Sequence, residues 1–192
     1  SADLIPQIWS ATFVAALCSR IHSEYCRLGA KTCPAAFEFG RLERPSSAGP
    51  ATDAALNFLD VAIRSAPDGG VLNIERFLDE LEVNGVPLWT ARSELFRAAK
   101  EQGCQAVVSI DSLDQYDELM NEGGFQLSRD GQALQGLFRA AAQTGRTGGS
   151  VYKVRVSFPS ELWHFYKEFS TNPMKDFDNC ILLHWDGGEL LK

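Results

Sequence analysis

The chain has no long apolar run, no dense set of cysteines and no motif with a fixed chemistry. Its longest apolar stretch, Ile8 to Leu17, is interrupted by Ser10 and Thr12 and is far shorter than the ~20 residues of a membrane-spanning helix. No basic residue precedes this stretch, so we expect no signal peptide and no membrane association. These absences leave a globular protein, and 192 residues that are 45% hydrophobic suffice for one domain or two small ones.

Cysteine is scarce, with five residues spread unevenly over the chain. Small secreted proteins usually carry an even and dense set of cysteines that pair as disulfides. We therefore expect reduced thiols and a cytoplasmic location. The formal net charge of -7 argues against indiscriminate binding to nucleic acid or anionic lipid, although it leaves room for a local basic surface.

The hydrophobic pattern predicts an α+β fold. An N-terminal helical segment, residues 1–45, is followed by an α+β domain, residues 46–192, and the two can also form one continuous domain. Helices of the second part are expected to pack on a small, mostly antiparallel sheet. The spacing of apolar residues predicts helices over 4–28, 52–63, 90–102, 112–121, 131–143 and 161–169, and strands over 106–110, 151–158 and 180–185.

The phrase LFRAA occurs twice, at Leu95–Ala99 and at Leu137–Ala141. Each copy lies in a helix-like stretch that ends near a glycine and is followed by a strand-like run. This order of helix, turn and exposed ribbon is typical of winged-helix modules, which present a helix to the major groove and a wing to the phosphates. Many α+β domains have the same order, and LFRAA consists mostly of favourable helix residues that can recur by chance.

Positive charge is concentrated between residues 129 and 157, where one acidic residue, Asp130, stands against five basic ones. The basic residues are Arg129, Arg139, Arg146, Lys153 and Arg155. Alternation in the strand predicted over 151–158 places Lys153 and Arg155 on its solvent face, opposite the side chains of Tyr152, Val154, Val156 and Phe158.

If the helix, the loop and the strand of this segment converge, the five cations form one patch. In that arrangement Arg139 lies on the presented helix, Arg146 at the tip of the wing, and Lys153 and Arg155 along it. The simpler interpretation is an ordinary solvated face whose charge balances the acidic stretch 111–122.

Our first functional hypothesis is a non-enzymatic regulatory or binding module that contacts nucleic acid through residues 129–157. The alternative is a protein-interaction subunit that uses the acidic stretch 111–122 or the aromatic stretch 162–169, without nucleic acid. The basic segment would serve equally well for a partner with an acidic surface. Neither hypothesis requires a cofactor, and neither specifies an oligomeric state.

Cys18, His22 and Cys26 follow one another at helical spacing along one flank of the first helix, and Cys33 lies just beyond its end. Sulfur and imidazole nitrogen are the ligands that zinc prefers. However, residues i and i+8 of a straight helix are about 12 Å apart along its axis, so both cannot readily reach one ion. We therefore predict no metal site and favour structural cysteines.

Cys180 and His184 support a third hypothesis, a cysteine-dependent intracellular enzyme. Three aspartates, Asp176, Asp178 and Asp186, lie nearby in the sequence, and a histidine oriented by a carboxylate can take the proton of a thiol. Cys180 begins an apolar stretch, however, without a glycine-rich elbow or a helix start beside it. A core position is therefore favoured, and no catalytic residue is predicted.

Overall fold

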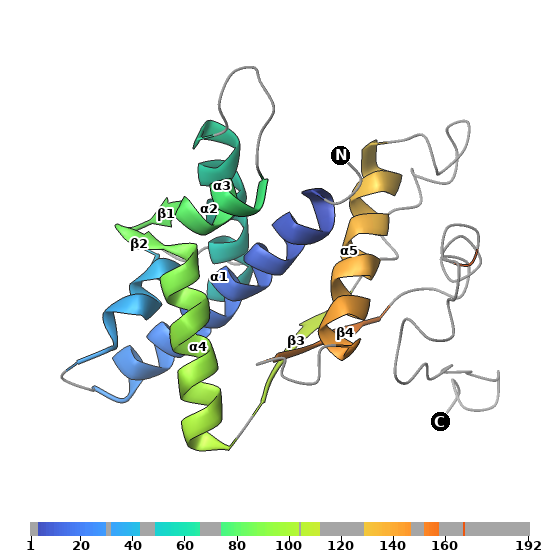
Figure 1. The fold of residues 1–192 in the computed structure, drawn as a ribbon. Helices are drawn as coiled ribbons and strands as arrows, with labels where there is room; N and C mark the ends of the chain where they lie inside the picture. The colour runs from blue at the N-terminus through green and yellow to red at the C-terminus, as the bar shows by residue number, and fades with distance from the viewer. Residues whose placement is uncertain are drawn as a thin grey trace, which may run out of the picture.

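The structure, a computed structural model, describes residues 4–29, 32–42, 49–65, 74–103, 105–111, 129–146, 152–157 and 167. Helices and two small sheets alternate in the described part, which is an α+β fold, as the sequence predicts (Figure 1). The elements are α1 (Leu4–Arg27), the 3-10 helix η1 (Ala35–Gly40), α2 (Pro50–Ser65), α3 (Ile74–Glu80), β1 (Glu82–Val83), β2 (Val86–Pro87), α4 (Leu88–Gln102), β3 (Ala106–Ile110), α5 (Arg129–Arg146) and β4 (Tyr152–Val156).

Helix α1 crosses the middle of the molecule, with α2, α4 and α5 around it (Figure 1). The helix predicted over 4–28 is confirmed, and Phe13, Val14 and Cys18 supply its buried side. Two hydroxyls are buried with them and find acceptors: Thr12 Oγ1 donates to the carbonyl of Ile8, and Ser19 Oγ donates to that of Pro50. The centre of the core therefore lies on α1.

Helix α2 begins at Pro50, two residues before the helix predicted over 52–63, because proline has no N–H to satisfy and suits the first turn. Its buried residues are Ala54, Phe58 and Ala62, whereas Leu56 and Ile63 are more than half exposed. The helix is therefore rotated so that these two apolar residues face away from the core. Packing decides this rotation: the ring of Phe58 lies 6.0 Å from that of Phe39 in η1.

Asn84 and Gly85 form the turn that joins β1 to β2 as a two-residue hairpin. Both residues have positive φ, 53° and 73°, which is what this tight turn requires. The Asn84 side chain donates hydrogen bonds of 2.8 and 2.9 Å to the backbone carbonyls of Glu38 and Arg41. The hairpin thereby holds the C-terminal end of η1 in place.

Helix α4 begins at Leu88, directly after Pro87 and two residues before the helix predicted over 90–102. Its predicted end is confirmed. Gly103 takes a left-handed conformation, and its N–H donates to the carbonyls of Ala99 and Lys100, as a glycine at this position commonly does.

Strands β3 and β4 pair in parallel, with Val107 opposite Lys153 and Ser109 opposite Arg155. We expected a mostly antiparallel sheet, and the longer of the two described sheets differs from that expectation. Because α5 lies in the connection between β3 and β4, the chain has the long crossover that parallel strands need. Within the described residues β4 is therefore not an arm of a hairpin, and the winged-helix arrangement stays a prediction.

The inner face of this sheet packs on the core. Tyr152 is buried, its ring meets that of Phe13 edge-on at 6.2 Å, and its hydroxyl lies 3.1 Å from Ser10 Oγ. Val154 and Val156 also contact the core, while Lys153 and Arg155 are exposed. The alternation predicted for this strand is confirmed over residues 152–156, and Phe158 lies outside the described residues.

Several predictions fall outside the described part of the chain: the helix over 112–121, the strand over 180–185 and, apart from Lys167, the helix over 161–169. The domain boundary near residue 45 stays a prediction, and α1 and α2 pack on each other across it. None of the described helices is both long and apolar enough to cross a membrane.

Candidate functional site

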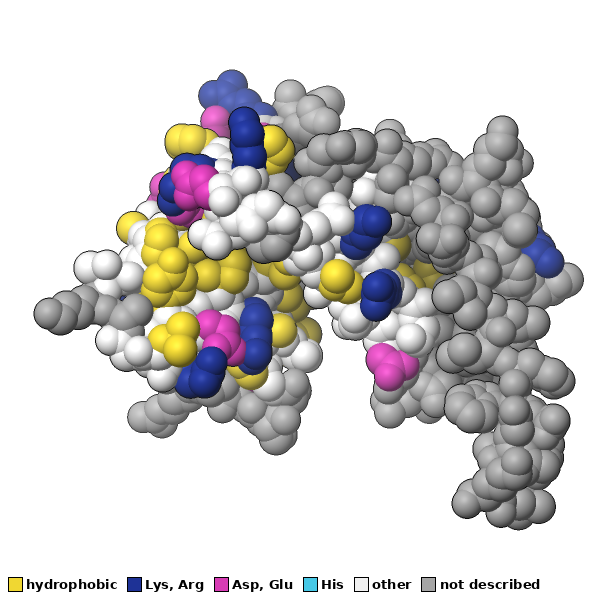
Figure 2. All heavy atoms as spheres, turned by 90° about the horizontal axis from the view of Figure 1, so that it is seen from below, with side chains coloured by type: hydrophobic (Ala, Val, Ile, Leu, Met, Phe, Trp, Pro, Cys, Tyr) yellow, Lys and Arg dark blue, Asp and Glu magenta, His cyan; other side chains and the backbone are white. Residues whose placement is uncertain are grey.

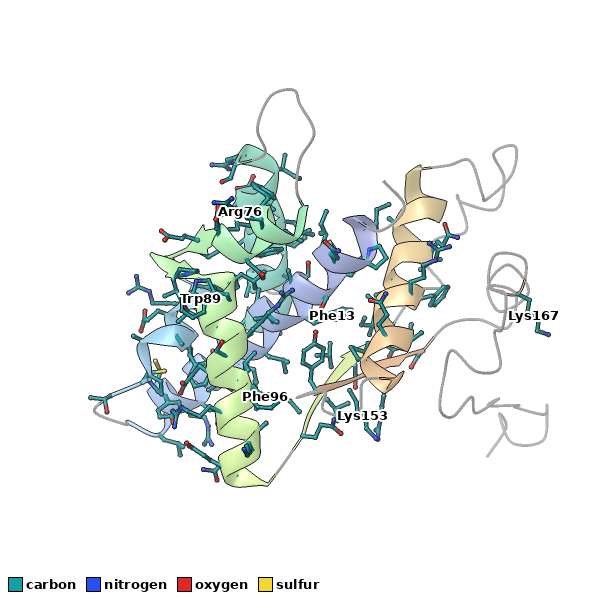
Figure 3. The ribbon with its side chains drawn as sticks, in the orientation of Figure 1. Phe13, Arg76, Trp89, Phe96, Lys153 and Lys167 are labelled. Atoms are coloured by element: carbon teal, nitrogen blue, oxygen red, sulfur yellow. The ribbon has the colours of Figure 1, made fainter. Side chains whose placement is uncertain are left out.

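Lys153 and Arg155 lie on the exposed face of the β3–β4 sheet. Their direct neighbours in β3 are Val107, which is 46% exposed, and Ser109, which is also exposed. Lys153 extends from the sheet on the side away from Phe13 and the core (Figure 3). We call these four residues, Val107, Ser109, Lys153 and Arg155, the outer face.

The outer face differs in charge pairing from the described arginines before residue 104. Every described arginine between residues 4 and 103 forms an ion pair with a carboxylate: Arg20 and Arg27 with Glu24, Arg41 with Glu38, Arg64 with Asp60, Arg76 with Glu80, Arg92 with Asp79, and Arg97 with Glu94 and Glu101. No carboxylate of the described residues pairs with Lys153 or Arg155. Seen from below, blue and magenta side chains touch on one half of the molecule. On the other half two blue side chains stand among white and yellow surface, and one magenta side chain lies a short way below them (Figure 2).

Of the other predicted cations, Arg139 lies away from this face. Arg139 is partly exposed on α5, and α5 packs on the inner side of the sheet, opposite the outer face. Arg129 and Arg146 are the first and last residues of α5, so their Cα atoms lie about 26 Å apart along the helix axis. Arg146 ends the helix and does not stand in the predicted wing loop. Lys153 and Arg155 thus share one face, and a single patch of all five cations stays a prediction.

The two LFRAA copies have different environments. Leu95 and Leu137 are both buried, but Phe96 is 52% exposed while Phe138 is fully buried. Helix α5 packs against both α1 and β4, and Leu134, Leu137 and Ala140–Ala142 are buried with Phe138. Helix α4 buries one side only, through Leu88, Ala91 and Leu95. The repeated phrase therefore does not mark two equivalent sites.

Helix α4 carries an exposed pair of aromatic residues that the sequence does not predict as a surface feature. Trp89 is 55% and Phe96 52% exposed, and the two residues are separated by two helical turns, which places them on the same side of α4. Both are labelled in Figure 3. Their spacing was visible in the sequence, but exposure depends on which side of α4 the core covers.

The cysteine and histidine residues considered as metal ligands are divided between core and surface. Burial, and then the charge of Cys33, raise the pKa of the Cys18 thiol to about 12. Cys26 is exposed, with its Sγ 3.8 Å from His22 Nδ1. Among the described residues, no group of three or more histidine, cysteine, aspartate or glutamate side chains is arranged to hold a metal ion.

Glu38 lies beside His22, and the sequence pattern of possible ligands does not include it. Its Oε1 lies 3.2 Å from His22 Nε2, and its Oε2 lies 3.0 Å from Arg41 Nε. Phe37 and Phe39 on either side are buried, and this FEF pattern was the only local signal. Cys180 and His184, the residues of the enzyme hypothesis, lie outside the described residues.

Comparison of the chain with protein-family models, with curated proteins and with solved structures gave no match. The functional argument therefore depends on the residues themselves.

Proposed function

We propose that this chain is a non-enzymatic binding module that holds an acidic protein segment on its outer face. One observation carries the proposal: Lys153 and Arg155 alternate on an exposed strand face, and no carboxylate of the described residues neutralises them, whereas the described arginines before residue 104 are all paired.

The spacing of the two cations suits an extended acidic segment. Residues i and i+2 of a strand project from the same face about 6.6 Å apart, and alternate side chains of an extended partner have the same separation. Val107, beside Lys153 in the neighbouring strand, adds an apolar contact. Exposed ion pairs contribute about 0.2–1 kcal/mol each, so we expect weak binding that salt reduces.

Nucleic acid is the second candidate partner, and the excess of positive charge over residues 129–157 favours it. Two clustered cations are a small footprint for a duplex, and the net charge of -7 repels a polyanion as a whole. An acidic protein segment, which carries fewer charges per unit length, is therefore our first choice.

We also propose that the module is cytoplasmic, because its cysteines are few and unevenly spread.

Fluorescence anisotropy with labelled probes tests the proposal. The probes are a peptide of alternating glutamate and valine, a single-stranded oligonucleotide and a duplex, each titrated with the full chain at about 50 mM and about 200 mM salt. Lys153→Ala/Arg155→Ala is the test variant. Arg64→Ala/Lys100→Ala removes the same charge from exposed positions on α2 and α4 and is the matched control.

We expect the acidic peptide to bind, the test variant to bind it about tenfold more weakly (about 1.4 kcal/mol), and the control to bind as the unaltered chain does. Binding of the oligonucleotides alone, with a salt slope that falls by about 2 in the test variant, would favour the second candidate. If no probe binds at low salt, or if both variants weaken binding equally, the outer face is not a binding site.

A further inference from the structure

A thiol, an imidazole and a carboxylate contact one another in a row near the C-terminal end of α1. Cys26 Sγ is 3.8 Å from His22 Nδ1, and His22 Nε2 is 3.2 Å from Glu38 Oε1. An ionised carboxylate only accepts hydrogen bonds, so in the neutral tautomer that pairs with Glu38 the proton is on Nε2. Nδ1 is then unprotonated and faces the thiol as a hydrogen-bond acceptor. This is the arrangement in which a histidine takes a proton from a cysteine nucleophile.

The fold fixes each member of this cluster from a different side. His22 and Cys26 are one helical turn apart on α1, which makes them neighbours on the helix surface. Glu38 comes from η1, where Arg41 holds its second oxygen and the Asn84 side chain binds its backbone carbonyl. The imidazole is only 15% exposed, so it is confined between α1 and η1 while the thiol faces solvent.

The other two described thiols lack this combination. Cys18 is fully buried, and burial raises its pKa to about 12. Burial, followed by the negative charges of Glu38 and Cys26, raises the pKa of the half-buried Cys33 thiol. Both groups are therefore held in the protonated, poorly nucleophilic form. Of the described cysteines, Cys26 alone is exposed and also has a hydrogen bond to an imidazole.

From this geometry we infer that Cys26 is a redox-active thiol that hydroperoxides oxidise, with His22 as its base and Glu38 as a positioning residue. The sulfur attacks one peroxide oxygen, the S–O bond forms and the O–O bond breaks. Sulfur loses two electrons, and the peroxide takes them. The thiol proton passes to His22 Nδ1 and then to the departing oxygen, so the products are Cys26 sulfenic acid and an alcohol, or water from hydrogen peroxide.

A hydroperoxide suits this site because it is small and uncharged and can reach an exposed thiol without a shaped pocket. The reaction is independent of the outer face, since the cluster lies on α1 and η1 whereas Lys153 and Arg155 lie on β4. The two proposals can therefore fail separately.

Trapping of the sulfenic acid tests the inference. The reduced full chain is treated with hydrogen peroxide in the presence of dimedone, and peptide mass spectrometry follows the labelling of all five cysteines. We expect Cys26 to be labelled first, about tenfold or more ahead of Cys33. We expect His22→Ala to slow labelling of Cys26 about a hundredfold or more, from the lower end of the range that a positioned base contributes, and added imidazole to restore part of the rate.

Glu38 is tested by paired substitutions. We expect Glu38→Gln to slow the labelling of Cys26 severalfold and Glu38→Asp, which keeps the carboxylate, to restore most of the rate. The matched control is Glu24→Gln, because Glu24 lies on the same end of α1 but binds Arg20 and Arg27. It should leave the rate unchanged, and a thermal melt of each variant shows that it is folded. The inference is overturned if another cysteine is labelled before Cys26, or if folded His22→Ala reacts at the original rate.

Discussion

Gly40 and Gly103 are required for two different physical reasons. A Cβ at Gly40 would overlap the backbone nitrogen of Ser19 and lie 2.6 Å from the carbonyl carbon of Cys18, so η1 approaches α1 too closely for any side chain. At Gly103 nothing lies within 4 Å of a Cβ, but φ is 59°, a conformation that costs other residues energy. One glycine provides room, and the other provides a backbone angle.

We therefore predict a larger loss of stability at Gly40. Gly40→Ala should lower the free energy of unfolding by about 3 kcal/mol, because backbone atoms have to move. Gly103→Ala should lower it by about 1 kcal/mol, the cost of a left-handed alanine. Urea denaturation of both variants measures the difference. Equal losses would show that η1 can move away from α1 at little cost.

For single residues, the sequence predicts which side chains share a face of one strand or one helix. It does not predict which residues of other elements lie beside them. Lys153 and Arg155 were placed together on a solvent face because side chains alternate along a strand. His22 and Cys26 were placed on one helix flank for a similar reason. Glu38 completes their cluster from a separate element, and no local period indicates which distant segment packs against a given turn.

The two LFRAA helices allow the same substitution to be compared in two environments. Phe138 on α5 is fully buried between α1 and the sheet, whereas Phe96 on α4 is 52% exposed. We expect Phe138→Ala to lower the free energy of unfolding by about 3–5 kcal/mol and Phe96→Ala to change it by about 0.5 kcal/mol. Denaturant titration of the two variants measures both. A large loss at Phe96 would mean that the exposed side of α4 is covered in solution.

Elements were predicted well where the local signal is strong. The long periodic helix α1, the glycine end of α4 and the alternating strand β4 all follow from spacing and turn chemistry. The buried side of α2 does not follow from the sequence, because a helix that is apolar on several sides is oriented by its neighbours. The parallel pairing of β3 with β4 was also missed, since strand direction depends on the course of the whole connection.

At the scale of the whole molecule, α1 joins parts that are distant in the sequence. It packs against α2, η1, α4 and α5, and one cluster of buried residues extends from Ala11 to Tyr152. Trp9 Nε1 donates a 2.9 Å hydrogen bond to the carbonyl of Ala133, and Ser10 meets the Tyr152 hydroxyl. Removal of α1 would expose apolar side chains on each of these elements.

The predicted boundary near residue 45 can be tested on this basis. A chain of residues 46–192 lacks Phe13 and Val14, which are buried in the intact protein, and burial of each such side chain is worth about 1.5–3 kcal/mol. Because whole domains are stable by only about 5–15 kcal/mol, we expect this fragment to unfold without a cooperative transition. Circular dichroism during heating measures this, with the full chain as the control. Residues 1–45 added as a separate peptide should restore a transition, and cooperative unfolding of 46–192 alone would establish it as an independent domain.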